Sequence, residues 1–416
     1  MAQKTLGEVA DYINGRAFKP DEWEDEGLPI IRIQNLTGST DICNRTTKTY
    51  EEKYLVVDGD LLFAWSASLG AYIWHGENGW LNQHIFKVIP HEGTDKQYLY
   101  YYLLHVVDQL YAKTHGSGMV HITLKPFKNT TIYIPSLSEQ RCIVDRIESL
   151  FAKLDEAKEK TQTIVDSFEL RKSAILHKAF MGELTERWRK EHGVGLDSWK
   201  NTTLSEIVSE FKYGTSEKST YNNTGMPVLR IPNVGAGTLS FEDMKYLAHN
   251  DIDEANQIHE NDLLIIRSNG SRDLVGKCAI VPALSRKFAY ASFLIRIKPS
   301  EQILPDYLAL YLNSTDARTQ MFKKAKSSAG IHNINSQELG SITINVPTVY
   351  EQSTLIAVLN RLLSKEQQAK EAAEAVLSQI DTIKKAILAR AFRGELGTND
   401  PTEEWAGKLL KTILER

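Results

Sequence analysis

The segment SAILHKAFMGEL, residues 173–184, returns as KAILARAFRGEL at residues 385–396, with eight identities in twelve positions. A second stretch, GLPIIRIQNL at residues 27–36, returns as GMPVLRIPNV at residues 225–234, with five identities in ten. The offset between the copies grows from 198 near the start to 212 near the end. Because order is kept while loops lengthen, the chain of 416 residues is a duplication of about 200 residues and not a short-period solenoid. Three shorter matches support this reading: Asp60-Leu61-Leu62 with Asp262-Leu263-Leu264, Tyr98-Leu99 with Tyr307-Leu308, and Pro135…Glu139-Gln140 with Pro347…Glu351-Gln352.

Each copy begins with a mixed segment, residues 1–135 and 204–347. Short apolar runs such as Leu61–Trp65 and Leu263–Ile266 alternate with Gly, Asn, Asp and Ser turns, which is typical of strands. Tyr98–Leu110 and Pro305–Asn313 have the pattern of short helices. We therefore predict one compact α/β body of about 140 residues in each copy.

Each copy ends with a long helix, predicted over residues 136–182 and 348–394. No Pro or Gly interrupts residues 139–180, and the apolar residues follow a heptad. The patterns Ser136-x-x-Glu139 and Thr348-x-x-Glu351 predict capping boxes, and Gly182 and Gly394 predict left-handed C-terminal caps. We expect the two helices to pair within the chain. The predicted core of this pair is Ile143, Ile147, Leu150, Leu154, Ile164, Phe168, Ile175, Leu355, Leu359, Leu362, Val376, Ile380, Ile383 and Ile387.

Polar residues interrupt the apolar seam at Thr161, Arg171 and Glu366. Two interpretations stand side by side. They are ordinary tolerated positions, or they fix the register of a helix pair with one allowed partner. Residues 183–203 are predicted as a linker and residues 395–416 as a tail, which packs near the N-terminus or contacts a partner.

Composition excludes several classes of protein. Apolar residues make up 42% and charged residues 25%, as in an ordinary globular chain. No run of 18 apolar residues occurs, and the first residues lack the core of a signal peptide. The three cysteines are far apart in the sequence, which excludes a CxxC metal site and makes a disulfide framework improbable. We therefore expect a cytoplasmic protein with no membrane contact.

The usual motifs of catalysis are missing. The sequence has no GxxxxGK[ST] loop, no GxGxxG, no HExxH and no EF-hand loop. It also lacks the Asn-Pro-Pro-aromatic tetrapeptide of amino-methyltransferases, and its histidines do not cluster at ligand spacing. We therefore predict a non-enzyme with no catalytic residue, no cofactor and no metal of its own.

The distribution of charge limits where nucleic acid could bind. Residues 1–135 hold 12 basic and 16 acidic residues, which accounts for the whole net charge of −4. Any affinity for DNA must therefore come from one face or be supplemented by partners. Polar loops with base-reading or phosphate-binding side chains are the candidates, although such residues also fill ordinary solvated turns. The candidates are Gln34, Asn35, Ser66, Asn82, Gln83, His84, His115, Ser117, Lys125, Lys212, Tyr213, Arg230, Asn233, Arg267, Asn269, Arg272, Lys324, Lys326, Asn333 and Asn335.

The order of motifs resembles the specificity subunit of type I restriction-modification systems. Pro-x-x-x-Glu-Gln opens each long helix and Ala-Phe-x-Gly-Glu-Leu closes it, and the likeness covers essentially the full chain. The resemblance implies an α/β (α+β) fold with two pseudo-twofold-related target recognition domains, joined by two long antiparallel coiled-coil helices.

The same resemblance implies a division of labour. Each recognition domain would read one half of a bipartite, asymmetric site in double-stranded DNA, and the helix pair would set the spacer. Two methyltransferase subunits and the restriction/translocase subunits would assemble on the chain, and they would bind S-adenosylmethionine, ATP and Mg²⁺. Two alternatives stay open at this point: a coiled-coil adaptor without DNA specificity, and a self-contained DNA methyltransferase or nuclease.

Overall fold

The chain forms two compact units in a computed structural model that describes residues 2–112, 121–222, 224–251, 253–328 and 330–396. Unit 1 comprises residues 1–162 and 374–416, and unit 2 comprises residues 163–373. The division passes through the long helices. Each unit therefore contains one α/β body, the start of one long helix and the end of the other.

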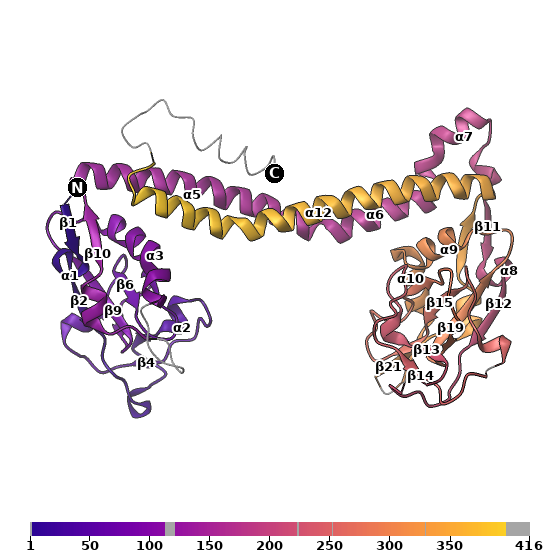
Figure 1. Cartoon of the computed structure of the whole chain (residues 1–416), viewed down its shortest axis with the longest axis horizontal. Coiled ribbons are helices and arrows are strands. Elements are labelled where there is room, and N and C mark those ends of the chain that lie inside the picture. Colours follow the sequence, from indigo (N-terminus) through magenta and orange to yellow (C-terminus); the bar gives the residue numbers. More distant parts are fainter. Residues whose placement is uncertain (1, 113–120, 223, 252, 329, 397–416) are drawn as a thin grey trace. The chain divides into compact units, whose positions relative to one another are not determined.

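Each body is built on the same four-stranded antiparallel sheet (Figure 1). Its strand order is β2-β9-β6-β7 in unit 1 and β12-β19-β15-β17 in unit 2. A smaller sheet in each body contains one parallel pair, β3 with β8 and β13 with β18. The strands of unit 1 are β1 Ala2–Thr5, β2 Ala10–Asn14, β3 Leu28–Ile31, β4 Arg45–Thr46, β5 Leu55–Val56, β6 Leu61–Ala64, β7 Gly70–Ile73, β8 Gly79–Leu81, β9 Ile85–Pro90 and β10 Thr131–Ile134.

Unit 2 repeats this plan and adds a three-stranded sheet of order β16-β21-β20. In unit 1 the single bridge Ser66–His121 lies where β16 pairs with β21 at Ser268–Asn333. The strands of unit 2 are β11 Lys200–Thr203, β12 Val208–Tyr213, β13 Pro227–Leu229, β14 Lys245–Tyr246, β15 Leu263–Ile266, β16 Ser268–Asn269, β17 Cys278–Ile280, β18 Ala289–Tyr290, β19 Leu294–Pro299, β20 Lys326–Ser328, β21 Ile331–Asn333 and β22 Thr343–Val346.

One helix packs on the large sheet of each body and brings it into contact with the long helices. Helix α3 contacts β7, and α9 contacts β17. The apolar side chains between these layers form one continuous core in each unit. The helices of the bodies are α1 Leu6–Val9, α2 Ile33–Leu36, α3 Lys96–Ala112 and α4 Leu124–Lys128 in unit 1, and α8 Leu204–Ile207, α9 Pro305–Leu312, α10 Thr315–Lys324 and α11 Ser336–Gly340 in unit 2.

The first long helix covers the predicted residues 139–180 and is interrupted at one residue, Ser167. It forms α5 (Leu137–Asp166) and α6 (Phe168–Phe180). Ser167 Oγ donates to the Thr163 carbonyl at 2.7 Å, and Arg171 Nη1 donates to the Ile164 carbonyl at 3.1 Å. In a regular helix the carbonyls of Thr163 and Ile164 would accept only backbone N–H groups. Here each also accepts a hydrogen bond from a side chain, which perturbs the helix. The second long helix, α12 (Val349–Ala391), is continuous over 43 residues, or about 65 Å.

Most of the predicted seam lies between paired helices within each unit. Ile143, Ile147, Leu150, Leu154, Ile380 and Ile387 are buried in unit 1, and Phe168, Leu355 and Leu359 are buried in unit 2. Ile175, Leu362, Val376 and Ile383 are half-buried. Ile164 is the correction: its side chain is 43% exposed beside the interruption at Ser167, so it is not a core residue.

The polar seam residues Arg171 and Glu366 contact each other. Arg171 Nε donates to Glu366 Oε2 at 2.7 Å, and both side chains are about half-buried. Because the pair forms at only one alignment of α6 with α12, it favours the interpretation that these residues fix register. Thr161 is half-buried.

The repeated Glu-Gln pair explains how each long helix is attached to its body. Gln140 is fully buried, and its Nε2 donates to the Gly93 and Pro135 carbonyls at 2.9 Å. Its Oε1 accepts from the Asp95 N–H at 2.8 Å. Gln352 makes the same three bonds in unit 2, to Gln302, Pro347 and Leu304. The motif satisfies buried backbone groups where the helix and the body meet.

The repeated Tyr-Leu and Ala-Phe motifs meet in the two cores. The Tyr98 hydroxyl donates to the Tyr133 carbonyl at 2.8 Å, and the Tyr307 hydroxyl donates to the Asn345 carbonyl at 2.7 Å. Phe392, at the end of α12, packs edge-on against Tyr98, and Phe180, at the end of α6, packs edge-on against Tyr307. Burial raises the pKa of Tyr307. The long helix of each repeat therefore ends on the body of the other repeat.

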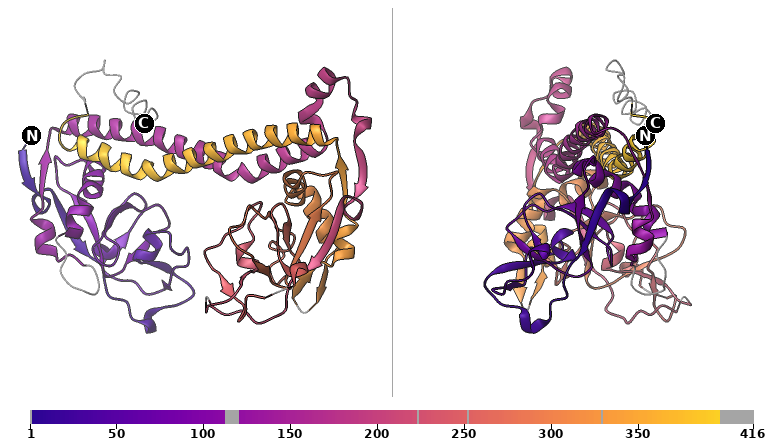
Figure 2. Two further views of the ribbon diagram at one scale, coloured as in Figure 1. Left: turned by 45° about the vertical axis from the view of Figure 1, so that its right-hand side comes forward. Right: turned by 90° about the vertical axis from the view of Figure 1, so that its left-hand side faces the viewer.

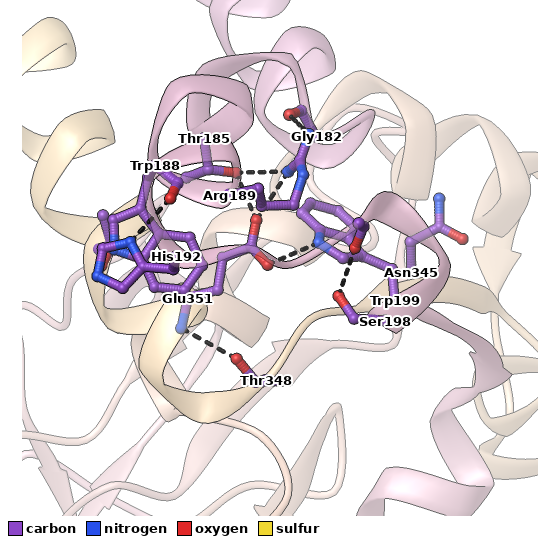
Figure 3. Close-up of polar contacts among 12 residues, drawn as sticks. Gly182, Thr185, Trp188, Arg189, His192, Ser198, Trp199, Asn345, Thr348 and Glu351 are labelled. Carbon is purple, nitrogen blue, oxygen red and sulfur yellow. Dashed lines mark hydrogen bonds and ion pairs between the residues drawn. The ribbon is translucent and has the colours of Figure 1, made fainter.

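The chain between the two repeats folds against the start of α12 (Figure 3). Residues 183–199, predicted as linker, form a turn and helix α7 (Glu186–His192), which stands on the opposite side of α6 from the body of unit 2 (Figure 2). The predicted linker also overlaps strand β11, which pairs with β22. Gly182 and Gly394 have φ of 81° and 74°, which confirms the left-handed caps.

Glu351 is fully buried at this junction. Its Oε1 accepts from the Arg189 guanidinium and from the Thr185 hydroxyl, both at 2.7 Å, and its Oε2 accepts from Trp199 Nε1 at 2.9 Å (Figure 3). The predicted capping box is therefore only half formed. Thr348 Oγ1 accepts from the Glu351 N–H at 3.3 Å, but the Glu351 carboxylate is directed at Arg189 and not back to the helix start.

Candidate nucleic-acid interface

In each body, four chain segments meet at one end of the strands of the large sheet. We call this place the first corner in unit 1 and the second corner in unit 2. The first corner consists of Asn14 at the end of β2, Trp65 after β6, Gln83-His84 before β9, and His121 before α4. The second corner consists of Tyr213 at the end of β12, Arg267 after β15, Ser292-Phe293 before β19, and Asn333 at the end of β21. The two corners occupy equivalent positions in the repeat.

The backbone of the two corners is held by matching hydrogen bonds. The Trp65 N–H donates to the His84 carbonyl at 3.0 Å, and the Arg267 N–H donates to the Phe293 carbonyl at 3.0 Å. The carbonyls of Trp65 and Arg267 in turn accept from Ile122 at 3.0 Å and from Ile334 at 2.9 Å. Gly15 and Gly214 follow the first strand in each corner, where a neighbouring carbonyl leaves no room for a Cβ atom.

The side chains of the first corner are aromatic and amide groups. Trp65 Nε1 donates to Asn14 Oδ1 at 2.9 Å, and the Trp65 and His84 rings lie edge-on with centroids 4.8 Å apart. Gln83 is exposed beside them. His84 has a φ of 75°, a strained value for a residue with a side chain. Strain of this kind is commonly found at functional sites.

The second corner contains a cation on an aromatic ring. The Arg267 guanidinium lies 4.8 Å from the centroid of Tyr213, and its Nη1 donates to the Ser292 carbonyl at 3.2 Å. Phe293 is 55% exposed next to them. Arg267 Nε and Asn333 Oδ1 are buried atoms that have no hydrogen-bond partner among the described residues.

The structure brings several sequence candidates together at the corners. Asn82, Gln83 and His84 lie at the first corner, and Lys212, Tyr213, Arg267, Asn269 and Asn333 lie at or next to the second. Arg272 lies 4.7 Å from the ring centroid of Phe322 in α10, and Lys324 is the last residue of that helix. Gln34 and Lys125 are exposed on the helices α2 and α4. His115, Ser117 and the side chain of Lys326 lie outside the described residues.

Two recurring candidates, Asn35 and Asn233, are corrected by the structure. Asn233 is 1% exposed; its Oδ1 accepts from the Arg230 N–H at 2.8 Å, and its Nδ2 donates to the Ser240 and Asp243 carbonyls at 3.1 Å. Asn35 forms the corresponding hydrogen bonds: its Oδ1 accepts from the Arg32 N–H, and its Nδ2 donates to the Thr40 and Ile42 carbonyls. Their amides hold a turn and are not available to a base.

Three further candidates also have structural roles. Asn335 Oδ1 accepts from the Glu338 N–H at 2.8 Å and caps α11. Arg230 is paired with Asp243 at 3.0 Å and lies largely inside the body. Ser66 is 3% exposed and belongs to the bridge with His121.

Sequence reasoning missed Asn14 and the pair Ser292-Phe293. Each occupies the position of a candidate residue in the other repeat. Asn82-Gln83-His84 precedes β9, and Ala291-Ser292-Phe293 stands in the same place before β19. The mixture of aromatic and polar residues gives no recognisable motif, because identical residues do not recur there.

No group of three metal-ligating side chains comes together within the part of the chain that the structure describes. In that same part, no helix is both long and apolar enough to cross a membrane.

Comparison with known proteins places the fold in a family. A model of the type I restriction modification DNA specificity domain matches residues 1–165 and 197–375. The chain belongs to this family. The matched ranges cover both bodies and their attached helices, so the chain is a specificity subunit of a type I restriction-modification system.

Individual members of the type I family match nearly the full chain. The EcoKI specificity subunit of Escherichia coli K12 is 25% identical over 95% of this chain and 88% of its own length. The MjaVIII specificity subunit of Methanocaldococcus jannaschii is 25% identical over 94% and 92%. The HsdS subunit from Thermoanaerobacter tengcongensis has the same fold, with a TM-score of 0.63, 18% identity and coverage of 95% and 97%. These findings give no support to the adaptor or to the self-contained enzyme.

Proposed function

We propose that the first and second corners each read one half of a split, asymmetric site in double-stranded DNA. The observation that carries this proposal is the contrast within the repeat. The backbone hydrogen bonds of Trp65 match those of Arg267, while the side chains of the two corners differ at every equivalent position. Equal scaffolds with different polar groups are what two readers of different sequences need.

The side chains of each corner suit particular contacts. In the second corner, Arg267 has the fork geometry for guanine and Asn333 the amide for adenine, while Lys212 can reach a phosphate. In the first corner, Asn14 and Gln83 carry amides and His84 a ring with one donor and one acceptor. Because Arg267 is held by Tyr213 and Ser292, little side-chain freedom would be lost on binding.

The test of this reading uses the full chain with its methyltransferase partner and a randomised pool of duplexes. We expect two short motifs, separated by a fixed number of unspecified base pairs, in the methylated fraction. One continuous motif would contradict the two-reader proposal. No sequence preference at all would instead favour a coiled-coil adaptor.

We also propose that the helix pair sets the spacer between the two half-sites. The support is the continuous helix α12, which begins in unit 2 and ends in unit 1, and the buried seams at both of its ends. Deleting seven residues from each of two facing helices shortens the pair by about 10 Å, or about three base pairs. Methylation mapping should then show both motifs unchanged and the spacer altered, whereas altered motifs would defeat this proposal.

The catalytic steps, methylation and restriction of DNA, would be carried out by partner subunits. We propose that two methyltransferase subunits and the restriction/translocase subunits assemble on the chain, and that they bind S-adenosylmethionine, ATP and Mg²⁺. This assignment makes the chain a non-catalytic subunit, and it rests on the absence of the corresponding sequence motifs. The three free cysteines suit a reducing cytoplasm. Methylation by the purified chain alone would overturn the assignment.

A further inference from the structure

A polar cleft of about 300 Å³ lies between α6 and the body of unit 2. Lys172 reaches it from α6, Lys277 from the turn before β17, and Arg318 from α10. Thr315, in the first turn of α10, also lines the cleft. Neither Arg267 nor Tyr213 of the second corner lines this cleft.

The guanidinium of Arg318 is fixed in place at this cleft. Its Nη2 donates to the Asp273 carbonyl at 2.7 Å, and its face lies 5.0 Å from the ring centroid of Phe322. Partial burial lowers the pKa of Arg318, which reflects a cation with reduced hydration. Such a cation interacts more strongly with an anion than a fully hydrated one does.

Two carboxylates, those of Glu169 and Asp273, also line the cleft, and both residues are exposed. Neither forms an ion pair with Lys172 or Lys277 among the described residues. Three cations against two carboxylates leave an excess positive charge. The first turn of α10 adds the positive end of a helix dipole, and it also holds Asp316, whose carboxylate pairs with His177.

The excess positive charge of this cleft does not recur at the equivalent place in unit 1. Lys384 of α12 corresponds to Lys172 in the repeat, and its Nζ pairs with Asp155 at 2.6 Å. The residue that corresponds to Asp155 in unit 2 is Gln367, whose amide donates to Glu371. Lys172 has therefore lost the carboxylate that neutralises its counterpart.

The other two cations are also specific to unit 2. Lys277 stands before β17 where the strand register of the first repeat has Gly70. Arg318 belongs to α10, whereas helix α3 of the first repeat has no lysine or arginine after Lys96. The second repeat has thus gained or released a positive charge at three positions of one cleft, whereas at a fourth lining position, Ser173, it lacks the charge of Lys385, which pairs with Asp108 in unit 1. A shared ligand is the simplest physical reason for that coincidence.

We propose that this cleft of unit 2 binds a phosphate group, held by Lys172, Lys277 and Arg318 with the Thr315 hydroxyl. Arg318 would supply parallel N–H donors and the two lysines point charges. The group is either a free phosphate or the backbone phosphate of DNA, and only the DNA source rests on the proposed function. Occupancy would tie α6 to α10 and so brace the body of unit 2 against its helix.

The first experiment titrates inorganic phosphate into the full chain at constant ionic strength and measures binding by calorimetry. Lys172→Gln and Lys277→Gln should each weaken binding by about tenfold, the loss of one charge-assisted contact. Lys384→Gln is the matched control, because it removes the corresponding lysine of unit 1, and it should leave phosphate binding unchanged. Circular dichroism in phosphate-free buffer verifies that each variant is folded.

The second experiment measures duplex binding against salt with the same variants in the complex with the methyltransferase partner. If DNA supplies the phosphate, Lys172→Gln should lower the salt slope by about one and leave the sequence preference unchanged. If a free anion is the ligand, the variants should change phosphate binding in the first experiment and leave duplex binding unchanged in the second. The proposal is overturned if Lys172→Gln and Lys277→Gln behave as the unaltered chain does in both experiments, or if Lys384→Gln has the same effect as they do.

Discussion

Units 1 and 2 differ in the side chains of their corners, and they agree at the buried glutamine that attaches each long helix to its body. Gln140 and Gln352 make the same three hydrogen bonds to buried backbone groups. Trp65 and Arg267 make matching backbone bonds, yet one carries an indole and the other a guanidinium. The comparison teaches that recurring residues in this chain build the scaffold and that diverging residues are the ones to examine for recognition.

A second difference lies at the starts of α5 and α12. Glu351 is fully buried in a network with Thr185, Arg189 and Trp199. Its counterpart Glu139 is half-buried, and among the described residues it forms no ion pair. The segment that connects the repeats thus adds a buried charge pair to unit 2.

The largest expected effect comes from removing the cation of that pair. Arg189→Ala leaves the Glu351 carboxylate buried without its partner, which typically costs about 3–5 kcal/mol. We expect unit 2 to lose this much protection in hydrogen exchange followed by mass spectrometry. Glu139→Ala is the matched control in unit 1 and should change the protection of unit 1 by less than about 1 kcal/mol. Equal losses from the two variants would show that the two helix starts do not differ.

The next effect separates scaffold from recognition at the recurring asparagine. Asn233→Ala removes a buried amide that is bonded to three backbone groups, so we expect a loss of about 1–3 kcal/mol in the free energy of unfolding. The methylated sequence motif should not change. A changed motif with unchanged stability would restore Asn233 as a base-reading residue and contradict the structural role.

A smaller effect concerns pH and should appear in unit 1 alone. Burial, with the nearby charge of Arg393, lowers the pKa of His105, and the counterpart in unit 2 is Ser314. The unfolded chain therefore binds this proton more readily than the folded chain. Stability from the neutral ring is present above the unfolded pKa, about 6.5, and is lost as the pH falls below it. His105→Asn should remove this acid sensitivity, measured as the pH dependence of hydrogen exchange in unit 1. An unchanged pH profile would contradict the role assigned to His105.

Much of the fold was predictable because its motifs recur. The duplication, the two bodies, the helix caps at Gly182 and Gly394 and most of the apolar seam follow from repeated residues. The interruption at Ser167 did not follow, because it depends on hydrogen bonds from Ser167 and Arg171 side chains to backbone carbonyls. Helix propensity and heptad patterns do not report such bonds.

The candidate site was predicted less well, for a physical reason. Asn35 and Asn233 were candidates because an amide side chain in a polar loop can read a base, but both amides hold a turn. Phe293 and Asn14 were missed because nothing in their local sequence marks them. They acquire meaning only when tertiary structure brings four separate segments to one corner.

The most direct test of the two corners is a reciprocal pair of variants, mapped by the methylated sites of a whole genome. Arg267→Ala in the second corner should relax one half-site, with a discrimination loss of about 1–3 kcal/mol, and leave the other half intact. Gln83→Ala in the first corner should relax only the opposite half. The account predicts that each variant changes one half-site and that the two halves are different. It would be contradicted if either variant weakened both halves equally, or if both variants altered the same half.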